Sequence, residues 1–150
     1  MDRLVIRGKK RLSGNVLISG AKNAAVAVIP AAIMADDVCV IDNLPYIEDV
    51  KCLYTTINKM GAECVYSDKH TLKIDSSSNV STTVTFDEVR KMRASYYLLG
   101  ALLARFKRAE VTMPGGCNFG TRPIDLHLKG FRALGAEVDV QGEVVCVRAD

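Results

Sequence analysis

The pattern of apolar and polar positions repeats once along this chain. Two stretches 74 residues apart carry apolar side chains at the spacing of one helix face. The matched positions are Val50 with Ile124, Tyr54 with Leu128, Ile57 with Phe131, and Met60 with Leu134. A second pair of apolar stretches, residues 24–34 and 95–105, matches at a spacing of 71. We therefore expect two copies of one structural unit.

Each copy is predicted to run strand, helix, strand, helix, strand, strand. The first copy is predicted to use residues 15–19, 22–35, 37–41, 46–60, 62–67 and 71–75. The second is predicted to use residues 80–85, 93–106, 109–113, 123–134, 136–140 and 143–148. Gly61 and Gly135 are expected to end the second helix of each copy, and Pro123 suits the first turn of a helix.

The first helix of each copy is apolar on nearly every side. This pattern, in residues 24–35 and 96–103, is typical of a helix buried all round. Several strands alternate instead, as residues 136–140 (AEVDV) do, which leaves one face of a sheet in water. The fold class is therefore α/β (α+β), with helices inside and sheets facing solvent. A ferredoxin-like two-layer α+β domain is the alternative.

Composition fits one globular domain and excludes several classes of protein. The 150 residues are 49% hydrophobic and 25% charged, with a net charge of +3 that is too small and too evenly spread for a nucleic-acid binder. The longest uncharged apolar stretch, residues 24–35, contains Pro30 and is shorter than the roughly 20 residues of a membrane span. The first residues lack the pattern of a signal peptide, so we expect a cytoplasmic protein without nucleic-acid or membrane partners.

Five cysteines and two histidines show no metal-ligand spacing and no disulfide framework. We expect reduced thiols and no metal. Cys39, Cys52, Cys64 and Cys146 lie in apolar runs or on a helix and are interpreted as small buried side chains. Cys117 differs, because it follows two glycines in a segment without a packing role.

Lys22 and Arg93 occupy equivalent positions at the start of the two apolar helices. The helix dipole disfavours a cation there, and a bound anion would resolve the conflict. Lys22 with Asn23, and Arg93 with Ala94 and Ser95, are therefore candidate contacts for phosphate or carboxylate. Ordinary surface cations are the alternative interpretation.

Residues 113–123 (MPGGCNFGTRP) carry the strongest local signal for chemistry. Arg122 and the helix that follows would lower the pKa of the Cys117 thiol and hold an anion. A turn with an uninvolved cysteine and a surface arginine is the alternative. Asp125 and His127 are expected on the helix surface.

Three blocks of sequence resemble the UDP-N-acetylglucosamine enolpyruvyl transferases, and the resemblance covers the whole chain. The blocks are residues 19–25 (SGAKNAA), 91–95 (KMRAS) and 114–127, which contains PGGC and GTRPIDLH. The resemblance implies an inside-out α/β barrel built of βαβαββ units. It also implies transfer of the enolpyruvyl group of phosphoenolpyruvate to the sugar 3-hydroxyl of UDP-N-acetylglucosamine, in peptidoglycan synthesis, without a metal or other cofactor.

The resemblance also implies roles for single residues. Lys22 and Asn23 match the pair that contacts phosphoenolpyruvate, and Cys117 matches the proton donor that adds to phosphoenolpyruvate and is alkylated by fosfomycin. The residues that match contacts to the UDP-sugar are Arg93, Arg122, Pro123, Ile124, Asp125 and Leu126, with Arg122 also near the phosphate. Asn118, Phe119, Thr121 and Tyr97 depart from the usual pattern of the family.

Members of the family are far longer than this chain and have two domains. We therefore expect residues 1–20 to form strands that pack on a second domain, and residues 21–150 to form two of three units of the first domain. Such a chain would be inactive alone and would self-associate through uncovered apolar residues, for which Leu98, Leu99, Leu102 and Leu103 are the candidates. The competing functions are a non-catalytic UDP-sugar-binding module and a 5-enolpyruvylshikimate-3-phosphate synthase.

Overall fold

The computed structural model describes residues 3–85, 87–113 and 124–150. The first half of the chain consists of α1 (Lys22–Ala32), β1 (Val38–Ile41), α2 (Glu48–Lys59), β2 (Glu63–Asp68) and β3 (Thr71–Asp75). The second half consists of β4 (Thr83–Val84), α3 (Asp87–Lys91), the 3-10 turn η1 (Arg93–Tyr96), α4 (Tyr97–Phe106), β5 (Arg108–Thr112), α5 (Asp125–Ala133), β6 (Glu137–Gln141) and β7 (Val144–Arg148).

The two sheets share one order of strands. In the first sheet β3 lies between β1 and β2, and both pairings are antiparallel. In the second sheet β7 lies between β5 and β6 in the same way, and β4 is added in parallel beside β5. Within the described residues, the equivalent edge of β1 carries no such strand.

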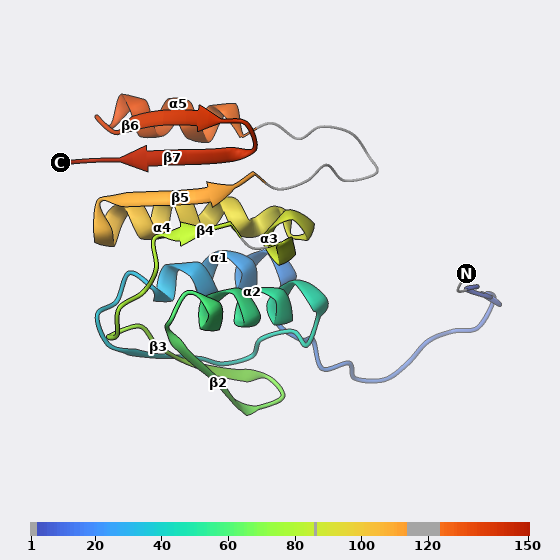
Figure 1. Cartoon of the computed structure of the whole chain (residues 1–150). Helices are drawn as coiled ribbons and strands as arrows, with labels where there is room; N and C mark the ends of the chain where they lie inside the picture. The colour runs from blue at the N-terminus through green and yellow to red at the C-terminus, as the bar shows by residue number, and fades with distance from the viewer. Residues whose placement is uncertain (1–2, 86, 114–123) are drawn as a thin grey trace.

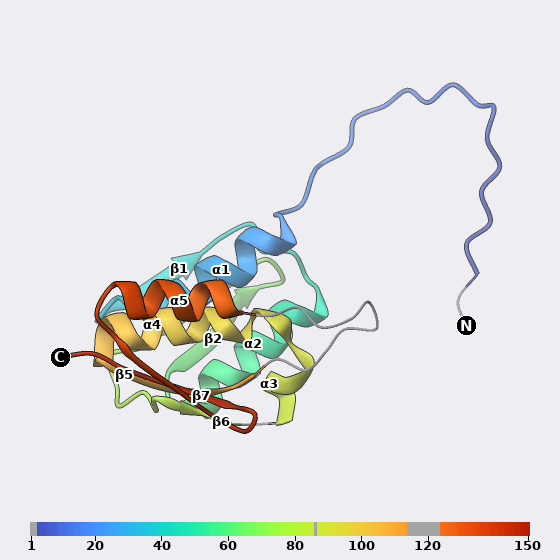
Figure 2. The ribbon, with the colours of Figure 1, turned by 90° about the horizontal axis from the view of Figure 1, so that it is seen from above.

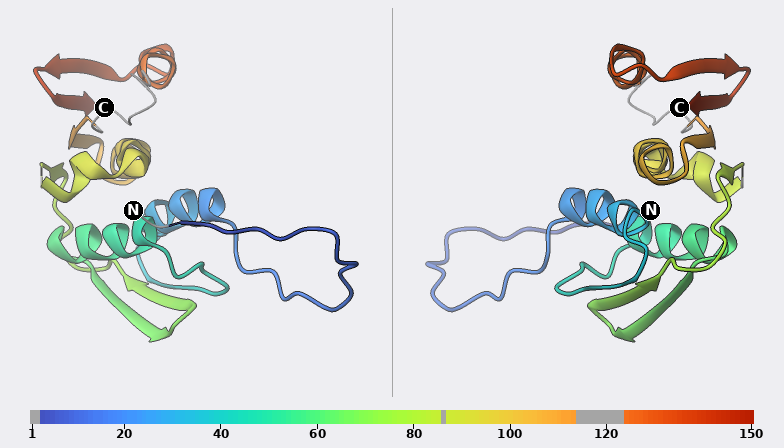
Figure 3. Two further views of the ribbon diagram at one scale, coloured as in Figure 1. Left: turned by 90° about the vertical axis from the view of Figure 1, so that its right-hand side faces the viewer. Right: turned by 90° about the vertical axis from the view of Figure 1, so that its left-hand side faces the viewer.

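Helices cover one face of each sheet and leave the other face to solvent (Figures 1 and 3). α2 packs on β2, α4 packs on β5, and α1 packs against both α2 and α4. The two halves therefore meet through their helices. Most of the largest buried side chains come from these three helices, from the residues just after them and from the first sheet, and they include Ile29, Ile33, Leu53, Ile57, Leu72, Ile74 and Leu102.

Burial corrects two expectations about the apolar helices. Leu98, Leu99 and Leu102 are fully buried rather than uncovered, and Leu103 is half-buried, because α1 and β5 pack against α4. Exposed apolar side chains lie elsewhere, among them Val28 on α1 (48%), Val40 on β1 (60%) and Leu126 on α5 (74%). The expectation that α1 is buried all round is therefore wrong for one of its faces.

The arginine Arg105 joins the two halves. Its Nη1 atom donates hydrogen bonds to the carbonyl oxygens of Ile33 (2.9 Å) and Ala35 (3.1 Å) and to Ser76 Oγ (2.9 Å). Its Nη2 atom forms an ion pair with Asp36, and the arginine side chain is only 13% exposed. Arg105 thus pairs the carbonyl oxygen of Ile33 after the end of α1, and it adds a second donor to that of Ala35, which also accepts a hydrogen bond of 2.7 Å from Ser76 Oγ.

Most of the expected helices and strands are present within a few residues of their predicted bounds. Gly61 and Gly135 follow the second helices with φ of 102° and 93°, which confirms their predicted role. The predicted helix 93–106 is divided into η1 and α4, and α3 precedes it. No described helix has the length and apolar character that crossing a membrane requires.

The expected strand at residues 15–19 is wrong. Residues 3–20 form no strand and extend away from the helices and sheets (Figure 2). Their apolar side chains are exposed, and Leu17 reaches 99%. A strand gains its hydrogen bonds from a neighbouring strand, and no described strand lies beside this segment.

Candidate functional site

The backbone at Gly20 lies against the loop that precedes α2. A Cβ atom at Gly20 would lie 1.8 Å from the carbonyl oxygen of Asn43 and 3.3 Å from Pro45 Cδ, so only glycine fits there. Asn43 itself has a left-handed backbone, with φ of 56°. This close contact holds the chain before α1 beside the chain before α2.

Lys22 and Asp49 form an ion pair between the beginnings of these two helices. Lys22 Nζ lies 2.6 Å from Asp49 Oδ2. Lys22 opens α1, whose first turn has no acidic residue and whose N-cap residue makes no capping side-chain hydrogen bond. Asp49 therefore supplies a counter-charge from within the chain, whereas the anion expected from the sequence was a bound ligand. The Lys22 side chain remains 58% exposed, which leaves it accessible to a second anion.

Sequence reasoning did not identify Asp49 as part of the site. The sequence does contain an indication of it, because Glu48 and Asp49 are consecutive acidic residues in the first turn of α2. Such residues are usually explained by the helix dipole alone. Only the fold reveals that α1 begins beside this turn.

The other predicted anion contacts on the first helices have different surroundings. Asn23 follows Lys22 on α1 and is exposed. Arg93 opens η1, and its side chain lies outside what the structure describes. Ser95 is fully buried, and its hydroxyl has no hydrogen-bond partner among the described residues. Ser95 is therefore not an accessible anion contact, contrary to the sequence-based expectation.

Three of the predicted UDP-sugar residues lie at the beginning of α5. Ile124 is buried at the N-cap position, and its carbonyl oxygen accepts hydrogen bonds from the backbone N–H groups of His127 (2.9 Å) and Leu128 (3.1 Å). Asp125 and Leu126 are exposed, and Leu126 reaches 74%. The predicted residues Cys117, Arg122 and Pro123 lie outside the described residues.

Aromatic contacts join the beginning of α5 to η1 and α4. The ring centroids of Tyr96 and His127 lie 4.7 Å apart, and those of Tyr96 and Tyr97 lie 4.5 Å apart. Tyr96 is half-buried, whereas Tyr97 and His127 are exposed. Tyr97 therefore lies at the surface rather than in the core, close to the first residues of α5.

α1, α2, α4 and α5 all begin at the same end of the molecule (Figures 1 and 2). The backbone N–H groups at a helix N-terminus and the positive end of the helix dipole favour anions. Lys22, Asn23, Arg93 and residues 124–127 all belong to this end. The arrangement can bind a ligand that carries several negative charges.

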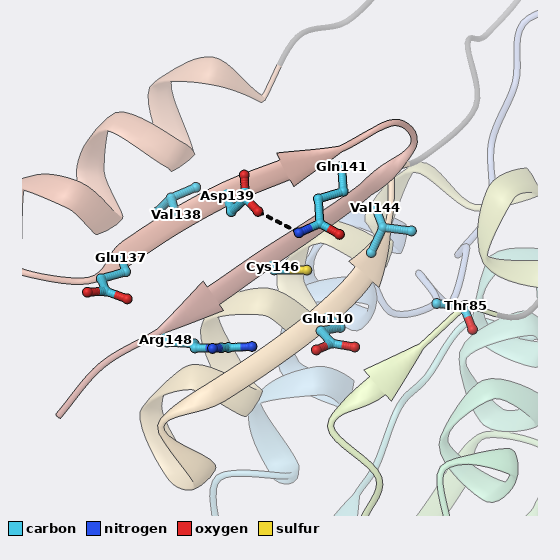
Figure 4. Close-up of a pocket in the computed structure, with 9 residues that line it drawn as sticks. All are labelled: Thr85, Glu110, Glu137, Val138, Asp139, Gln141, Val144, Cys146 and Arg148. Carbon is cyan, nitrogen blue, oxygen red and sulfur yellow. Dashed lines mark hydrogen bonds between the residues drawn. The ribbon is translucent and has the colours of Figure 1, made fainter.

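A cavity of about 570 Å³ lies elsewhere, on the solvent-facing side of the second sheet (Figure 4). Glu110, Glu137, Asp139, Cys146 and Arg148 are among its lining residues, and Asp139 Oδ2 accepts a hydrogen bond of 2.7 Å from Gln141 Nε2. None of the described residues that the sequence predicted for the site lines this cavity.

The cysteines are less uniform than the sequence indicated. Cys64 is buried, and burial raises the pKa of its thiol to about 12. Cys146 is half-buried between Glu110 and Asp139 on neighbouring strands. The expectation that it is a buried core residue is therefore wrong. Burial, followed by the two carboxylates, raises the pKa of Cys146. Both thiols are therefore held in their protonated, unreactive form.

Comparison with known proteins gives a consistent family assignment. The model of a family described as EPSP synthase (3-phosphoshikimate 1-carboxyvinyltransferase) matches residues 6–150. UDP-N-acetylglucosamine 1-carboxyvinyltransferase of Clostridium botulinum is 54% identical over 100% of this chain and 36% of its own length. UDP-N-acetylglucosamine 1-carboxyvinyltransferase 3 of Caldanaerobacter subterraneus is 51% identical over 100% of this chain and 36% of its own length. The chain thus spans about a third of the length of these curated relatives.

Solved structures agree with this assignment. The enolpyruvyl transferase NikO from Streptomyces tendae matches with a TM-score of 0.74 and 27% identity, over 95% of this chain and 31% of that one. EPSP synthase from Acinetobacter baumannii matches with a TM-score of 0.65 and 17% identity, over 90% and 32%, which is a likeness of fold alone. The mixed helix and sheet fold and the resemblance found in the sequence are both confirmed. The chain therefore belongs to the EPSP synthase (3-phosphoshikimate 1-carboxyvinyltransferase) family.

Proposed function

We propose that this chain forms part of an enzyme that transfers the enolpyruvyl group of phosphoenolpyruvate to the 3-hydroxyl of UDP-N-acetylglucosamine. The observation that carries the proposal is the gathering of four helix beginnings at one end, with Lys22 exposed among them. Both substrates are polyanions, which suits such an end. The names and identities of the curated relatives support UDP-N-acetylglucosamine as the acceptor.

The reaction is an addition followed by an elimination. The sugar hydroxyl oxygen bonds to C2 of phosphoenolpyruvate while a proton is added to its C3 methylene group. The C2–O bond to phosphate then breaks, and C3 loses a proton, so that the enolpyruvyl ether and inorganic phosphate are released. Protonation of C3 develops positive charge at C2, and a positioned proton donor lowers the barrier to that step.

We assign the phosphoenolpyruvate contacts to Lys22, Asn23, Cys117 and Arg122. The ammonium of Lys22 and the guanidinium of Arg122 balance the charge of the carboxylate and phosphate groups. Cys117 is the proton donor, and its thiol is also the group that adds to phosphoenolpyruvate and reacts with fosfomycin. Asp49 positions Lys22 through the 2.6 Å ion pair.

We assign the UDP-sugar to the beginnings of η1 and α5. The assigned residues are Arg93, Arg122, Pro123, Ile124, Asp125 and Leu126. The exposed side chain of Leu126 offers an apolar surface for a ring, and the free backbone N–H groups of the first turn of α5 suit a phosphate. Tyr97 stacks on Tyr96, which contacts His127 of α5, so its ring can contribute a second flat surface near the beginning of α5.

We further propose that the chain supplies two βαβαββ units of an inside-out α/β barrel. The common order of strands in both sheets supports repeated units. The unpaired edge of β1 and the exposed face of α1 would be covered by a third unit, and residues 1–20 would pack on a second domain. The reaction would take place in the cytoplasm as a step of peptidoglycan synthesis, without a metal or other cofactor.

Phosphate release from phosphoenolpyruvate tests the proposal, with the protein expressed from its complete gene. We expect turnover with UDP-N-acetylglucosamine and none with shikimate 3-phosphate, whereas the reverse would assign the protein to the synthase that makes 5-enolpyruvylshikimate 3-phosphate. Lys22→Ala should chiefly impair the use of phosphoenolpyruvate, and Arg93→Ala chiefly the binding of the UDP-sugar. Binding of UDP-N-acetylglucosamine without turnover would favour a non-catalytic module.

A further inference from the structure

A second cavity, of about 550 Å³, lies between α2 and the β2–β3 hairpin. Its lining residues are Tyr46, Lys51, Tyr54, Thr55, Tyr66, Asp68 and Lys69. Three of the five tyrosines of the chain are thus gathered in one place. This volume is in the range of cavities that hold small organic ligands. We call it the tyrosine pocket.

The tyrosine pocket is separate from the end of the molecule where Lys22 lies. Asp49, the partner of Lys22, and Lys51 are two positions apart on α2, and residues at that spacing point to opposite sides of a helix. None of the residues assigned to phosphoenolpyruvate or to the UDP-sugar that the structure describes lines the tyrosine pocket. A ligand held there would therefore not compete with these substrates.

The walls of the pocket are flat and apolar. The ring of Tyr66 meets those of Tyr54 and Tyr46 at centroid distances of 5.1 Å and 6.5 Å, the first tilted and the second edge-on. Rings in these arrangements leave faces and edges on which another flat ring can stack. The chemistry of the walls therefore favours a ligand with an aromatic ring.

The pocket also carries excess positive charge. Lys51 Nζ and Lys69 Nζ both lie over the ring of Tyr46, at 4.3 Å and 5.2 Å from its centroid. The nearest carboxylate to Lys51 is that of Glu48, at 3.9 Å, and the structure gives Lys69 no ion pair among the described residues. Two ammonium groups are thus held beside one aromatic ring, and among the described residues only that of Lys51 pairs with a carboxylate.

The acidic residue of the pocket does not neutralise these lysines. Asp68 Oδ1 accepts a hydrogen bond of 2.7 Å from the backbone N–H of His70. This bond, together with a second from the Thr71 side chain, lowers the pKa of Asp68 and keeps its carboxylate directed to the β2–β3 turn. Asp68 therefore forms no ion pair with Lys51 or Lys69 among the described residues, and the charges of the three lining residues sum to +1.

One hydroxyl group in the pocket lacks a partner. The hydroxyl oxygen of Tyr66 is buried and makes no hydrogen bond to any described residue. A buried hydroxyl without a partner costs free energy, which a ligand acceptor would recover. The neighbouring ring of Tyr46 is 50% exposed, so this side of the pocket is open to solvent.

We propose that the tyrosine pocket binds a small anion built on an aromatic ring, with the ring against Tyr54 and Tyr66 and the negative group between Lys51 and Lys69. A carboxylate or a phosphate on the ring would meet this requirement. Two probes distinguish the two negative groups. 2-Naphthoate carries a carboxylate on a flat ring system, and adenosine 5′-monophosphate carries a phosphate.

Calorimetric titration of the protein expressed from its complete gene tests the proposal. The titration is made with UDP-N-acetylglucosamine present at a saturating concentration and without phosphoenolpyruvate, so that the UDP-sugar site is filled and no turnover takes place. We expect at least one of the two probes to bind more tightly than adenosine, which lacks the charge, and inorganic phosphate, which lacks the ring. No binding of either probe up to about 10 mM, a concentration that detects even weak ligands, would overturn the proposal.

Matched lysine variants locate the bound anion. Lys69→Gln should weaken binding by about fourfold at low salt, the value expected for a charge pair at about 5 Å in water. Lys73→Gln removes a lysine from the exposed side of β3 and should leave binding unchanged. Equal effects of the two variants would mean that the anion is attracted by general charge, and the proposal would be wrong.

Tyr66→Phe separates binding from folding. Without ligand, this variant should unfold at a higher temperature than the original protein, because it removes a buried hydroxyl that has no partner. It should nevertheless bind the probe more weakly, because the acceptor loses its donor. A variant that is more stable and binds the probe equally well would overturn the role of the Tyr66 hydroxyl. The result does not depend on the proposed reaction, because a failed enolpyruvyl transfer assay would not change whether the tyrosine pocket binds the probe.

Discussion

Lys22 Nζ lies 2.6 Å from Asp49 Oδ2, so the first residue of α1 is tied to the first turn of α2. Both side chains remain more than one-third exposed, which makes the pair a weak contributor to stability. Its main effect is to fix where the ammonium group of Lys22 is held. We therefore interpret Asp49 as a positioning residue for the proposed reaction.

The first prediction concerns Asp49→Asn. The variant should lower kcat/KM for phosphoenolpyruvate by about 10- to 100-fold, because a displacement of about 1 Å in a reacting group has effects of this size. Its free energy of unfolding should change by less than about 1 kcal/mol. Steady-state kinetics and denaturant unfolding measure the two effects. A large loss of stability with unchanged kinetics would show that the role of Asp49 is structural.

Gly20→Ala should destabilise the fold and impair the site together. Its Cβ atom would meet the carbonyl oxygen of Asn43 at 1.8 Å, so the backbone before Lys22 must move. We expect a loss of about 1–3 kcal/mol, as for other overpacked positions. Gly8→Ala is the matched control, since nothing lies within 4 Å of a Cβ atom there. Thermal unfolding of both variants measures the effect. Equal unfolding temperatures for Gly20→Ala and Gly8→Ala would contradict the close contact at Gly20.

Cys117 should be the cysteine that electrophiles modify first. Burial holds Cys64 protonated, and burial with two neighbouring carboxylates does the same for Cys146, so neither competes at neutral pH. Mass spectrometry after limited treatment with fosfomycin measures the site of reaction. Cys117→Asp should keep a proton donor and resist the drug, whereas Cys117→Ser should be severely impaired. Modification of Cys64 before Cys117 is the contrary result.

The buried thiol of Cys64 predicts a loss of stability in alkaline solution. An ordinary cysteine ionises near 9.0, whereas burial raises the pKa of Cys64 to about 12 in the folded chain. Between these values the unfolded chain has released a proton that the folded chain still holds, so the unfolding free energy falls as the pH rises. Denaturant unfolding from pH 8 to pH 11 in about half-unit steps should show a shallower decline for Cys64→Ala. Parallel curves would place the titrating group elsewhere.

Arg105→Met should destabilise the contact between the two halves. The variant removes the donor to the carbonyl oxygen of Ile33 and one of two donors to that of Ala35, which keeps its 2.7 Å bond from Ser76 Oγ. We expect a loss of about 1–3 kcal/mol, from one buried acceptor left unpaired and two further hydrogen bonds lost. Asp36→Asn should cost less than about 1 kcal/mol, because Asp36 is highly exposed. Equal losses in the two variants would show that the ion pair, not the carbonyl contacts, carries the stability.

The elements of the fold were predictable where the local pattern was strong. The apolar spacing of Val50, Tyr54 and Ile57 predicted α2, and Gly61 predicted its end. Residues 15–19 contain a short run of apolar residues like that of a buried strand but lack a neighbouring strand, and the run itself does not show which strand would pair with it. The burial of Leu98 and Leu99 depends in the same way on where α1 packs, which is a property of the whole fold.

The site was predictable as a set of residue types but not as an arrangement. Lys22 was recognisable because a cation at a helix start conflicts with the dipole. Asp49 and the tyrosine pocket were not, because they join segments that only the fold brings together. The buried hydroxyl of Ser95 illustrates the opposite error, in which a suitable residue type is placed out of reach of any ligand.

The order of strands within each sheet has a consequence for how the chain folds. β2 and β3 are joined by a tight turn, and so are β6 and β7, while β1 and β5 are each separated from these hairpins by one helix. The two hairpins therefore pair residues that are close in sequence, and such contacts form quickly because little loop entropy is lost, whereas β1 and β5 pair with residues more distant along the chain. Each half can collapse on its own before the other. The slower step is then the docking of α4 against α1, when the guanidinium of Arg105 must give up its water to reach Ile33 and Ala35.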